Sequence, residues 1–200
     1  MKTRAAGGSS SGSAVSISDH MAAASIGSDT GGSTRTPAAF CGIVGFKPTT
    51  TRMSPDGVFP LSKSFDAAGP MATSVSCCTI LDSLMAGGPG EDEAPVALNG
   101  IRLAMPNGYL FENLDPHVAH SFNMAIERLS AAGAIINDIT INEIETLRPS
   151  NNPKSIVAAE AYAIHKDRLE AGLGAQYDPL VAFRLQSGKD ILASDYINML

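Results

Sequence analysis

Apolar residues recur at helical spacing in two stretches of the chain, and each stretch has stop signals at its end. The first stretch runs from residue 75 to 85, with apolar positions at Val75, Cys78, Leu81, Leu84 and Met85. The second starts at Asp115, a residue type that caps helices, followed by Pro116 at the first helical position. Its apolar face comprises Val118, Phe122, Ile126 and Leu129. Both patterns end at glycines and predict helices over about 75–85 and 115–132.

Shorter apolar runs predict strands at 22–27, 43–46, 101–105 and 134–141, and further helices are expected at 13–18, 151–172, 178–187 and 194–200. Residues 54–57 (Ser-Pro-Asp-Gly) form a strong turn signal, and 91–99 reads as an exposed acidic loop. His165, beside Lys166 and Asp167, is predicted to lie on a polar helix face. Because helices and strands alternate, the pattern predicts an α/β layered protein, and we expect a single domain over 1–200.

The composition narrows the classes of partner and compartment. The chain has 200 residues, of which 44% are hydrophobic, enough for one substantial core. Its net charge of −6, with no basic cluster, argues against direct nucleic-acid binding. No window approaches the roughly 18 apolar residues that a membrane helix needs, and no apolar run follows the basic residues of the first four positions. With three poorly spaced cysteines, we expect a cytoplasmic protein without disulfides.

Two clusters of glycine and serine stand out within residues 7–49: Gly7-Gly8-Ser9-Ser10-Ser11-Gly12 and Gly31-Gly32-Ser33. A serine among closely spaced backbone N–H groups has what acyl transfer needs, a nucleophile beside donors for an oxyanion. Taken alone, such clusters are more often turns and helix caps. The first cluster also fits a G-x-S-x-G nucleophile elbow with Ser10 as nucleophile, although no strand precedes it. A phosphate-binding loop is unsupported, because no Gly-Lys-Ser/Thr follows.

The same stretch resembles the signature of the amidase signature family of serine hydrolases. The resemblance rests on Gly7-Gly8-Ser9-Ser10, Gly27-Ser28-Asp29-Thr30-Gly31-Gly32-Ser33, Arg35, Pro37-Ala38-Ala39-Phe40-Cys41-Gly42 and Gly45-Phe46-Lys47-Pro48-Thr49. It continues more weakly through 64–66, 69–72, 152–153, 159–162 and 193–197, and so covers nearly the whole chain. Members of that family are more than twice as long. The resemblance therefore implies α/β/α layers around a mixed β-sheet, here incomplete at both ends.

The resemblance also assigns roles to individual residues. Ser33 would be the nucleophile, and Ser9 the bridging serine, reached through a cis peptide bond after Gly8. The backbone N–H groups of Thr30, Gly31, Gly32 and Ser33 would form the oxyanion hole. Asp29, Arg35 and Ser10 would hold the loop in shape. Neither a metal nor a cofactor is implied. His117 and His120 are three residues apart, but with no third ligand nearby a solvated helix face is the better interpretation.

The third member of the family's triad is a lysine that acts as base through Ser9, and it lies far upstream of that serine. Only eight residues precede Ser9, and Lys2 matches no part of the lysine's motif. Lys47 matches the family, but as part of a structural turn. A serine hydroxyl without a base is a poor nucleophile at neutral pH. We therefore expect the chain to be inactive and poorly folded when expressed as it stands.

The implied activity is hydrolysis of a carboxamide C–N bond through a Ser33 acyl-enzyme. The expected partner is a small amide substrate, with homo-oligomers possible and no membrane partner. Within the family, the alternative is the A subunit of a glutamyl/aspartyl-tRNA amidotransferase, although residues 53–64 look more like general amidases. Outside it, the alternative is a non-catalytic truncated fragment or a binding module.

Overall fold

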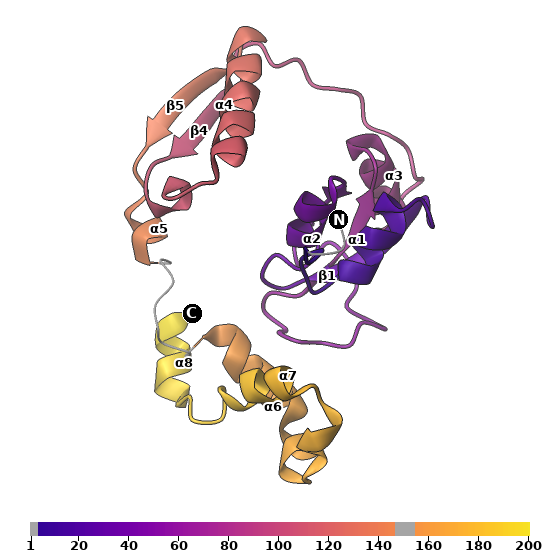
Figure 1. Ribbon diagram of the computed structural model, residues 1–200, viewed down its shortest axis with the longest axis vertical. Helices are drawn as coiled ribbons and strands as arrows, with labels where there is room; N and C mark the ends of the chain where they lie inside the picture. Colours follow the sequence, from indigo (N-terminus) through magenta and orange to yellow (C-terminus); the bar gives the residue numbers. More distant parts are fainter. Residues whose placement is uncertain (1–3, 147–154) are drawn as a thin grey trace. The chain divides into compact units, whose positions relative to one another are not determined.

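The computed structural model describes residues 4–146 and 155–200, which form two compact units (Figure 1). The first unit contains the described residues up to Glu93 together with those from 155 to Leu200, and the second contains residues 94–146. Both units combine helices with a small sheet, so the α/β class expected from the sequence is confirmed. The strands of the described residues fall into one antiparallel and one parallel sheet.

The sheet of the first unit has three strands in the order β1-β3-β2, all antiparallel. Its strands are β1 (Ala24–Asp29), β2 (Val44–Gly45) and β3 (Ala67–Ala72). Gly27 pairs with Gly69 across β1 and β3. Both positions are crowded: a Cβ on Gly27 would lie 2.8 Å from the hydroxyl oxygens of Ser10 and Thr34, and one on Gly69 would lie 2.0 Å from the Phe46 carbonyl oxygen. The two glycines therefore let neighbouring segments approach the sheet closely.

Three helices accompany this sheet: α1 (Ser11–Ser18), α2 (Arg35–Cys41) and α3 (Val75–Met85). The buried core between them is built from Ala14, Ile17, Ala38 and Met71, with Cys41 and Ile43 packed against it. Two alanines in this core keep α1 and α2 close to the strands. The Ser13 hydroxyl donates to the Ile26 carbonyl at 3.1 Å, which ties α1 to β1 as well.

The C-terminal part of the first unit is helical. It contains α6 (Ile156–Glu170), the short 3₁₀ helix η2 (Leu173–Gln176), α7 (Pro179–Gln186) and α8 (Ala193–Met199). Ser155 caps α6 by accepting from the Ala158 N–H, and Asp178 caps α7. The polar helix face predicted for His165 is wrong, because this side chain is 9% exposed and bonds the Tyr177 hydroxyl at 2.8 Å. Phe59, from a distant loop, packs on the same ring.

The second unit is a βαβ arrangement. Strands β4 (Arg102–Pro106) and β5 (Ile135–Ile139) pair in parallel, with Leu103 opposite Ile136, and α4 (Pro116–Ala131) connects them and lies along them (Figure 1). A short 3₁₀ helix η1 (Tyr109–Phe111) and α5 (Asn142–Thr146) complete the unit. The Asp115 carboxylate accepts from the His117 N–H at 2.9 Å, which confirms the predicted cap.

Most predicted elements are present, but several observed elements differ from the prediction, among them the short η1, α5 and η2, which were not predicted. Strand β3 and helix α2 were not predicted, because Ala67–Ala72 contains a glycine and a proline and Arg35–Cys41 has too few turns for a periodic pattern. The long helix predicted over 151–172 begins at Ile156 as α6, and 151–154 lie outside the described residues.

Across 4–146 and 155–200, no helix is both long and apolar enough to cross a membrane.

Candidate active site

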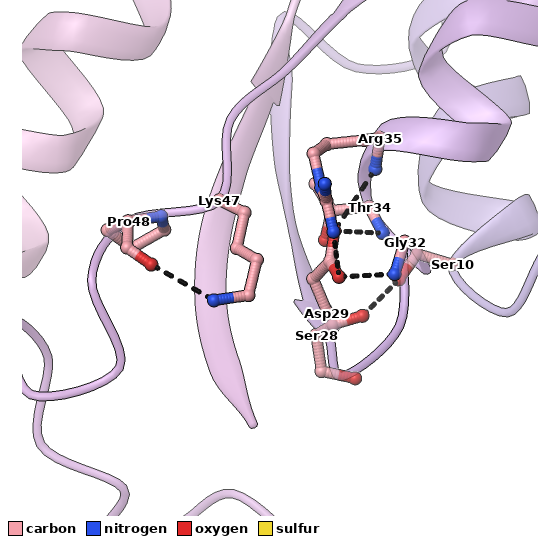
Figure 2. A network of polar contacts seen from close by, with 8 residues as sticks. All are labelled: Ser10, Ser28, Asp29, Gly32, Thr34, Arg35, Lys47 and Pro48. Atoms are coloured by element: carbon pink, nitrogen blue, oxygen red, sulfur yellow. Dashed lines mark hydrogen bonds and ion pairs between the residues drawn. The ribbon is translucent and has the colours of Figure 1, made fainter. Parts of the chain in front are cut away.

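The two glycine and serine clusters lie against each other in the folded chain. The backbone N–H of Ser10 donates to the Ser33 carbonyl at 3.1 Å, and the Ser10 hydroxyl donates to the Ser28 carbonyl at 3.3 Å (Figure 2). The peptide bond between Gly8 and Ser9 is cis, as the resemblance implied. Gly7 has φ +80°, and a Cβ there would lie 3.0 Å from Pro37 in α2. The first cluster is thus fitted between the start of α2 and the end of β1.

Asp29, at the end of β1, organises the second cluster around its carboxylate. This side chain is completely buried and accepts from the Gly32 N–H at 2.6 Å and the Thr34 N–H at 3.2 Å (Figure 2). Arg35 adds its own N–H at 3.4 Å, its Nε at 2.9 Å and its Nη2 at 3.1 Å. Both oxygens of the Asp29 carboxylate accept hydrogen bonds, and these bonds hold the backbone of the loop 29–35 around the carboxylate. From the sequence we expected Asp29 and Arg35 to hold the loop, and the structure brings their side chains together.

The ionisation of Asp29 follows from these contacts. Burial alone would raise the pKa of the Asp29 carboxyl, but the hydrogen bonds from Arg35, Gly32 and Thr34 outweigh it and lower the pKa to about 2. The same contact raises the pKa of Arg35, chiefly through its hydrogen bond to Asp29. The pair is therefore charged on both sides at neutral pH. A buried carboxylate with this many donors is suited to holding backbone rather than to accepting a proton.

The expected set of four oxyanion donors needs one correction. The Gly32 N–H donates to Asp29, because a buried carboxylate must find donors, and so it is already in use. Within the described residues, the N–H groups of Thr30, Gly31 and Ser33 make no hydrogen bond. Gly32 itself has φ +112°, a conformation that turns the backbone tightly at this point. Three unused donors therefore cluster at a sharp turn beside the Ser33 side chain.

The two serines predicted to react are accessible. Ser9 is exposed and Ser33 is half-buried, and neither hydroxyl has a hydrogen-bond partner among residues 4–146 and 155–200. The Lys47 amino group donates to the Pro48 carbonyl at 3.4 Å, and Figure 2 shows its side chain directed at that group. The Lys47 amino group thus contacts the carbonyl group of the next residue, and residues 46–49 belong to no helix or strand. No group of three potential metal-ligating side chains occurs in the described part of the chain.

Two carboxylates that the sequence reasoning gave no role also belong to this region. Asp66 accepts from the Thr30 hydroxyl, and Glu160 accepts from the hydroxyls of Ser62 and Ser64. Their segments were noticed only as weaker matches to the family. The available signal was that Asp66 and Glu160 are each the single charged residue of their segments, 64–72 and 155–164. Which donors they would meet depends on contacts that join positions up to 98 residues apart.

Comparisons with known proteins give one consistent result. The family model described as amidase matches residues 1–196. Indoleacetamide hydrolase of Allorhizobium ampelinum is 37% identical over 184 residues, covering 88% of this chain and 37% of that protein. The A subunit of the glutamyl-tRNA(Gln) amidotransferase of Methylococcus capsulatus is also 37% identical, over 157 residues, covering 72% of this chain and 32% of that protein.

A solved structure agrees in fold. A crystal structure described as amidase superposes with a TM-score of 0.82 at 33% identity, covering 97% of this chain and 43% of that one. The chain therefore spans about a third of the length of the two relatives named above, and less than half of this structure. Its match extends over almost all its own residues.

Proposed function

Because this chain belongs to the amidase family, we propose that it carries the nucleophile and oxyanion-binding part of an enzyme that hydrolyses a carboxamide C–N bond. The proposal rests on the hydrogen bonding of the loop 29–35. Asp29 holds this loop by hydrogen bonds to Gly32, Thr34 and Arg35, and so leaves the N–H groups on either side of Gly32 unused, next to the Ser33 hydroxyl. A nucleophile and preorganised donors at one turn are the minimum that acyl transfer requires.

The chemistry would run in two stages. The Ser33 hydroxyl oxygen attacks the amide carbonyl, a C–O bond forms, and the carbonyl electron pair moves to the oxygen. In this proposal the N–H groups of Thr30, Gly31 and Ser33 stabilise that negative charge, whereas the Gly32 N–H donates to Asp29. The tetrahedral intermediate then collapses, the C–N bond breaks, and the nitrogen takes a proton and leaves as ammonia or an amine. Water hydrolyses the acyl-Ser33 ester and restores the serine.

We assign the proton relay to Ser9: its hydroxyl takes the Ser33 proton while passing its own proton to a base, and the reverse relay delivers a proton to the leaving nitrogen. The Ser10 N–H bonds the Ser33 carbonyl, so the residue before it, Ser9, is held at the same loop. The family resemblance gives the base as a lysine acting through Ser9, and this sequence contains no match to that lysine's motif. Ser10 would hold the two loops together through its bonds to Ser28 and Ser33.

The two relatives indicate two substrate classes. The indoleacetamide hydrolase indicates small amides, and the amidotransferase subunit indicates glutamine. Both relatives share 37% sequence identity with this chain, so identity does not separate the two classes. We favour the general amidase, since residues 53–64 resemble that group more closely. We further propose a cytoplasmic enzyme. Turnover of a panel of small amides, with glutamine included, separates the two classes: ammonia release from glutamine alone would favour the amidotransferase.

The direct test is covalent labelling of the full-length protein with a fluorophosphonate, followed by mass spectrometry of the labelled peptide. Labelling should map to Ser33, vanish in Ser33→Ala and persist in Ser10→Ala. Ser9→Ala should slow labelling strongly while leaving the protein folded. Labelling that survives Ser33→Ala but disappears with Ser10→Ala would support the nucleophile elbow instead. A folded protein with neither labelling nor amide turnover would be the non-catalytic alternative.

A further inference from the structure

The second carboxylate near the loop 29–35 is Asp66, and it links that loop to a different part of the chain. One oxygen of Asp66 accepts from the Thr30 hydroxyl. The other accepts from the backbone N–H groups of Leu61 at 2.7 Å and Ser62 at 3.0 Å. We call residues 61–66 the Asp66 loop. Its backbone turns around the same carboxylate that holds Thr30.

The Asp66 loop is itself held by Glu160 of α6. Glu160 accepts from the Ser62 hydroxyl at 2.5 Å, and from the N–H and hydroxyl of Ser64 at 3.0 and 2.5 Å. The Tyr196 hydroxyl of α8 donates to the same carboxylate at 2.7 Å. Ser62 is completely buried, so its hydroxyl has no water to replace Glu160. Burial opposes the ionisation of Glu160, but the donated hydrogen bonds prevail and lower the pKa of its carboxyl to about 2.

These contacts form a continuous chain from the C-terminal helices to the nucleophile loop. It runs from Tyr196 and Glu160 through Ser62 to Asp66 and ends at Thr30. Thr30 is the residue after Asp29 and carries one of the unused N–H groups. The Asp29 carboxylate accepts hydrogen bonds from backbone N–H groups between Gly32 and Arg35, but none from Thr30. The orientation of the Thr30 peptide therefore depends on its side chain and on Asp66.

We infer that Asp66 is a positioning residue that fixes Thr30 within the oxyanion hole, and that Glu160 holds the Asp66 loop in the place this requires. The inference rests on the proposed function, because that function makes the Thr30 N–H an oxyanion donor. The effect of Asp66 on the position of Thr30 does not depend on catalysis. Because a displaced oxyanion donor weakens binding of the transition state more than binding of the substrate, its loss should appear in kcat rather than KM.

The test compares Thr30→Val, which removes the hydroxyl, with Thr30→Ser, which keeps it. Amide hydrogen exchange of the full-length protein, read on peptides covering 29–35, is the first measurement. Thr30→Val should speed exchange there by about tenfold, since a hydrogen bond to a charged group is lost, and Thr30→Ser should leave it unchanged. Asp66→Ala should speed it at least as much, and the double variant Asp66→Ala/Thr30→Val no further. Asp56→Ala is the matched control, since the Asp56 carboxylate makes no hydrogen bond among the described residues.

The second measurement is turnover, with kcat and KM determined separately. Thr30→Val should lower kcat by about 10–100-fold with KM little changed, and Thr30→Ser should restore it. Unchanged exchange in Thr30→Val, or additive effects of Asp66→Ala and Thr30→Val, would overturn the inference. Faster exchange with wild-type kcat in an active enzyme would also overturn it. A wild-type protein without turnover or Ser33 labelling would refute the proposed function instead, while the exchange data would still report on Asp66 and Thr30.

Discussion

Arg35 donates to both oxygens of the Asp29 carboxylate, from Nε at 2.9 Å and from Nη2 at 3.1 Å. The Asp29 side chain is fully buried, whereas that of Arg35 is 54% exposed, so the guanidinium closes the carboxylate off from solvent at one side. The geometry is that of a planar fork meeting a planar carboxylate, in which two parallel bonds fix orientation as well as distance. The pair therefore sets the direction of the loop 29–35 as well as its charge balance.

The first prediction concerns Arg35→Lys. A lysine can supply a charge but only one of the two bonds, so the loop should lose its fixed orientation. We expect the melting temperature to fall by about 2–4 °C and kcat to fall by about tenfold, with KM little changed. Arg52→Lys is the matched control, because Arg52 also pairs with a carboxylate, that of Asp82 at 2.6 Å. It should affect stability alone. A rise in KM with stability intact would place Arg35 in the substrate site instead.

Acid should destabilise the protein through the Glu160 cluster, which gives the second prediction. The folded-state pKa of Glu160 is about 2, below its ordinary value of 4.5. The stabilisation is therefore fully present above pH 4.5 and is lost as the pH falls from 4.5 towards 2. In Glu160→Gln, the free energy of unfolding should be lower at neutral pH and should fall less over this range. Ser64→Ala, which removes one donor, should be intermediate. Denaturant melts at several pH values measure this, and parallel profiles for wild type and Glu160→Gln would contradict it.

The third prediction is that Gly32 tolerates no side chain. Its φ of +112° is unfavourable for other residues, and an added Cβ would lie 2.9 Å from the Thr36 hydroxyl oxygen. Gly32→Ala should therefore shift the N–H that donates to Asp29 and displace the donors on either side. We expect fluorophosphonate labelling of Ser33 to slow by about 10–100-fold. Gly12→Ala is the control, as its Cβ would meet no atom within 4 Å and its φ lies outside the left-handed region. Equal labelling of the two variants would contradict the prediction.

Local sequence patterns predicted much of this fold and part of its site. The helices α3 and α4 follow from apolar periodicity and caps, and the proximity of Asp29 and Arg35 follows from their spacing around three small residues. Strand β3 was missed because its glycine and proline weaken any strand signal, yet both residues are buried in the sheet. In β3, close packing in the sheet outweighs the low strand propensity of the glycine and the proline.

The long-range polar contacts could not be predicted at all. Asp66 and Glu160 find their partners across 36 and up to 98 residues, and no periodicity encodes which hydroxyls they meet. The same holds for the Gly32 N–H, which was expected among the oxyanion donors and instead satisfies Asp29. His165 is buried, and one of the rings in contact with it is that of Phe59, which lies more than a hundred positions away. In each case the deciding interaction is tertiary and lies outside the segment that carries the residue.

The last prediction contrasts two glycines of the first unit. Gly69→Ala places a methyl group 2.0 Å from the Phe46 carbonyl oxygen, which belongs to backbone bonded to the same sheet through the Phe46 N–H and Pro70 carbonyl. Backbone on both sides cannot yield as a flexible side chain would, so β2 and β3 must separate. We expect a loss of about 2–3 kcal/mol in the free energy of unfolding. Gly12→Ala, in α1, meets no atom within 4 Å and should stabilise by about 0.5 kcal/mol, because alanine loses less backbone entropy in a helix. Urea melts of both variants test the pair, and similar stabilities for the two would show that the segments at β3 can move apart freely.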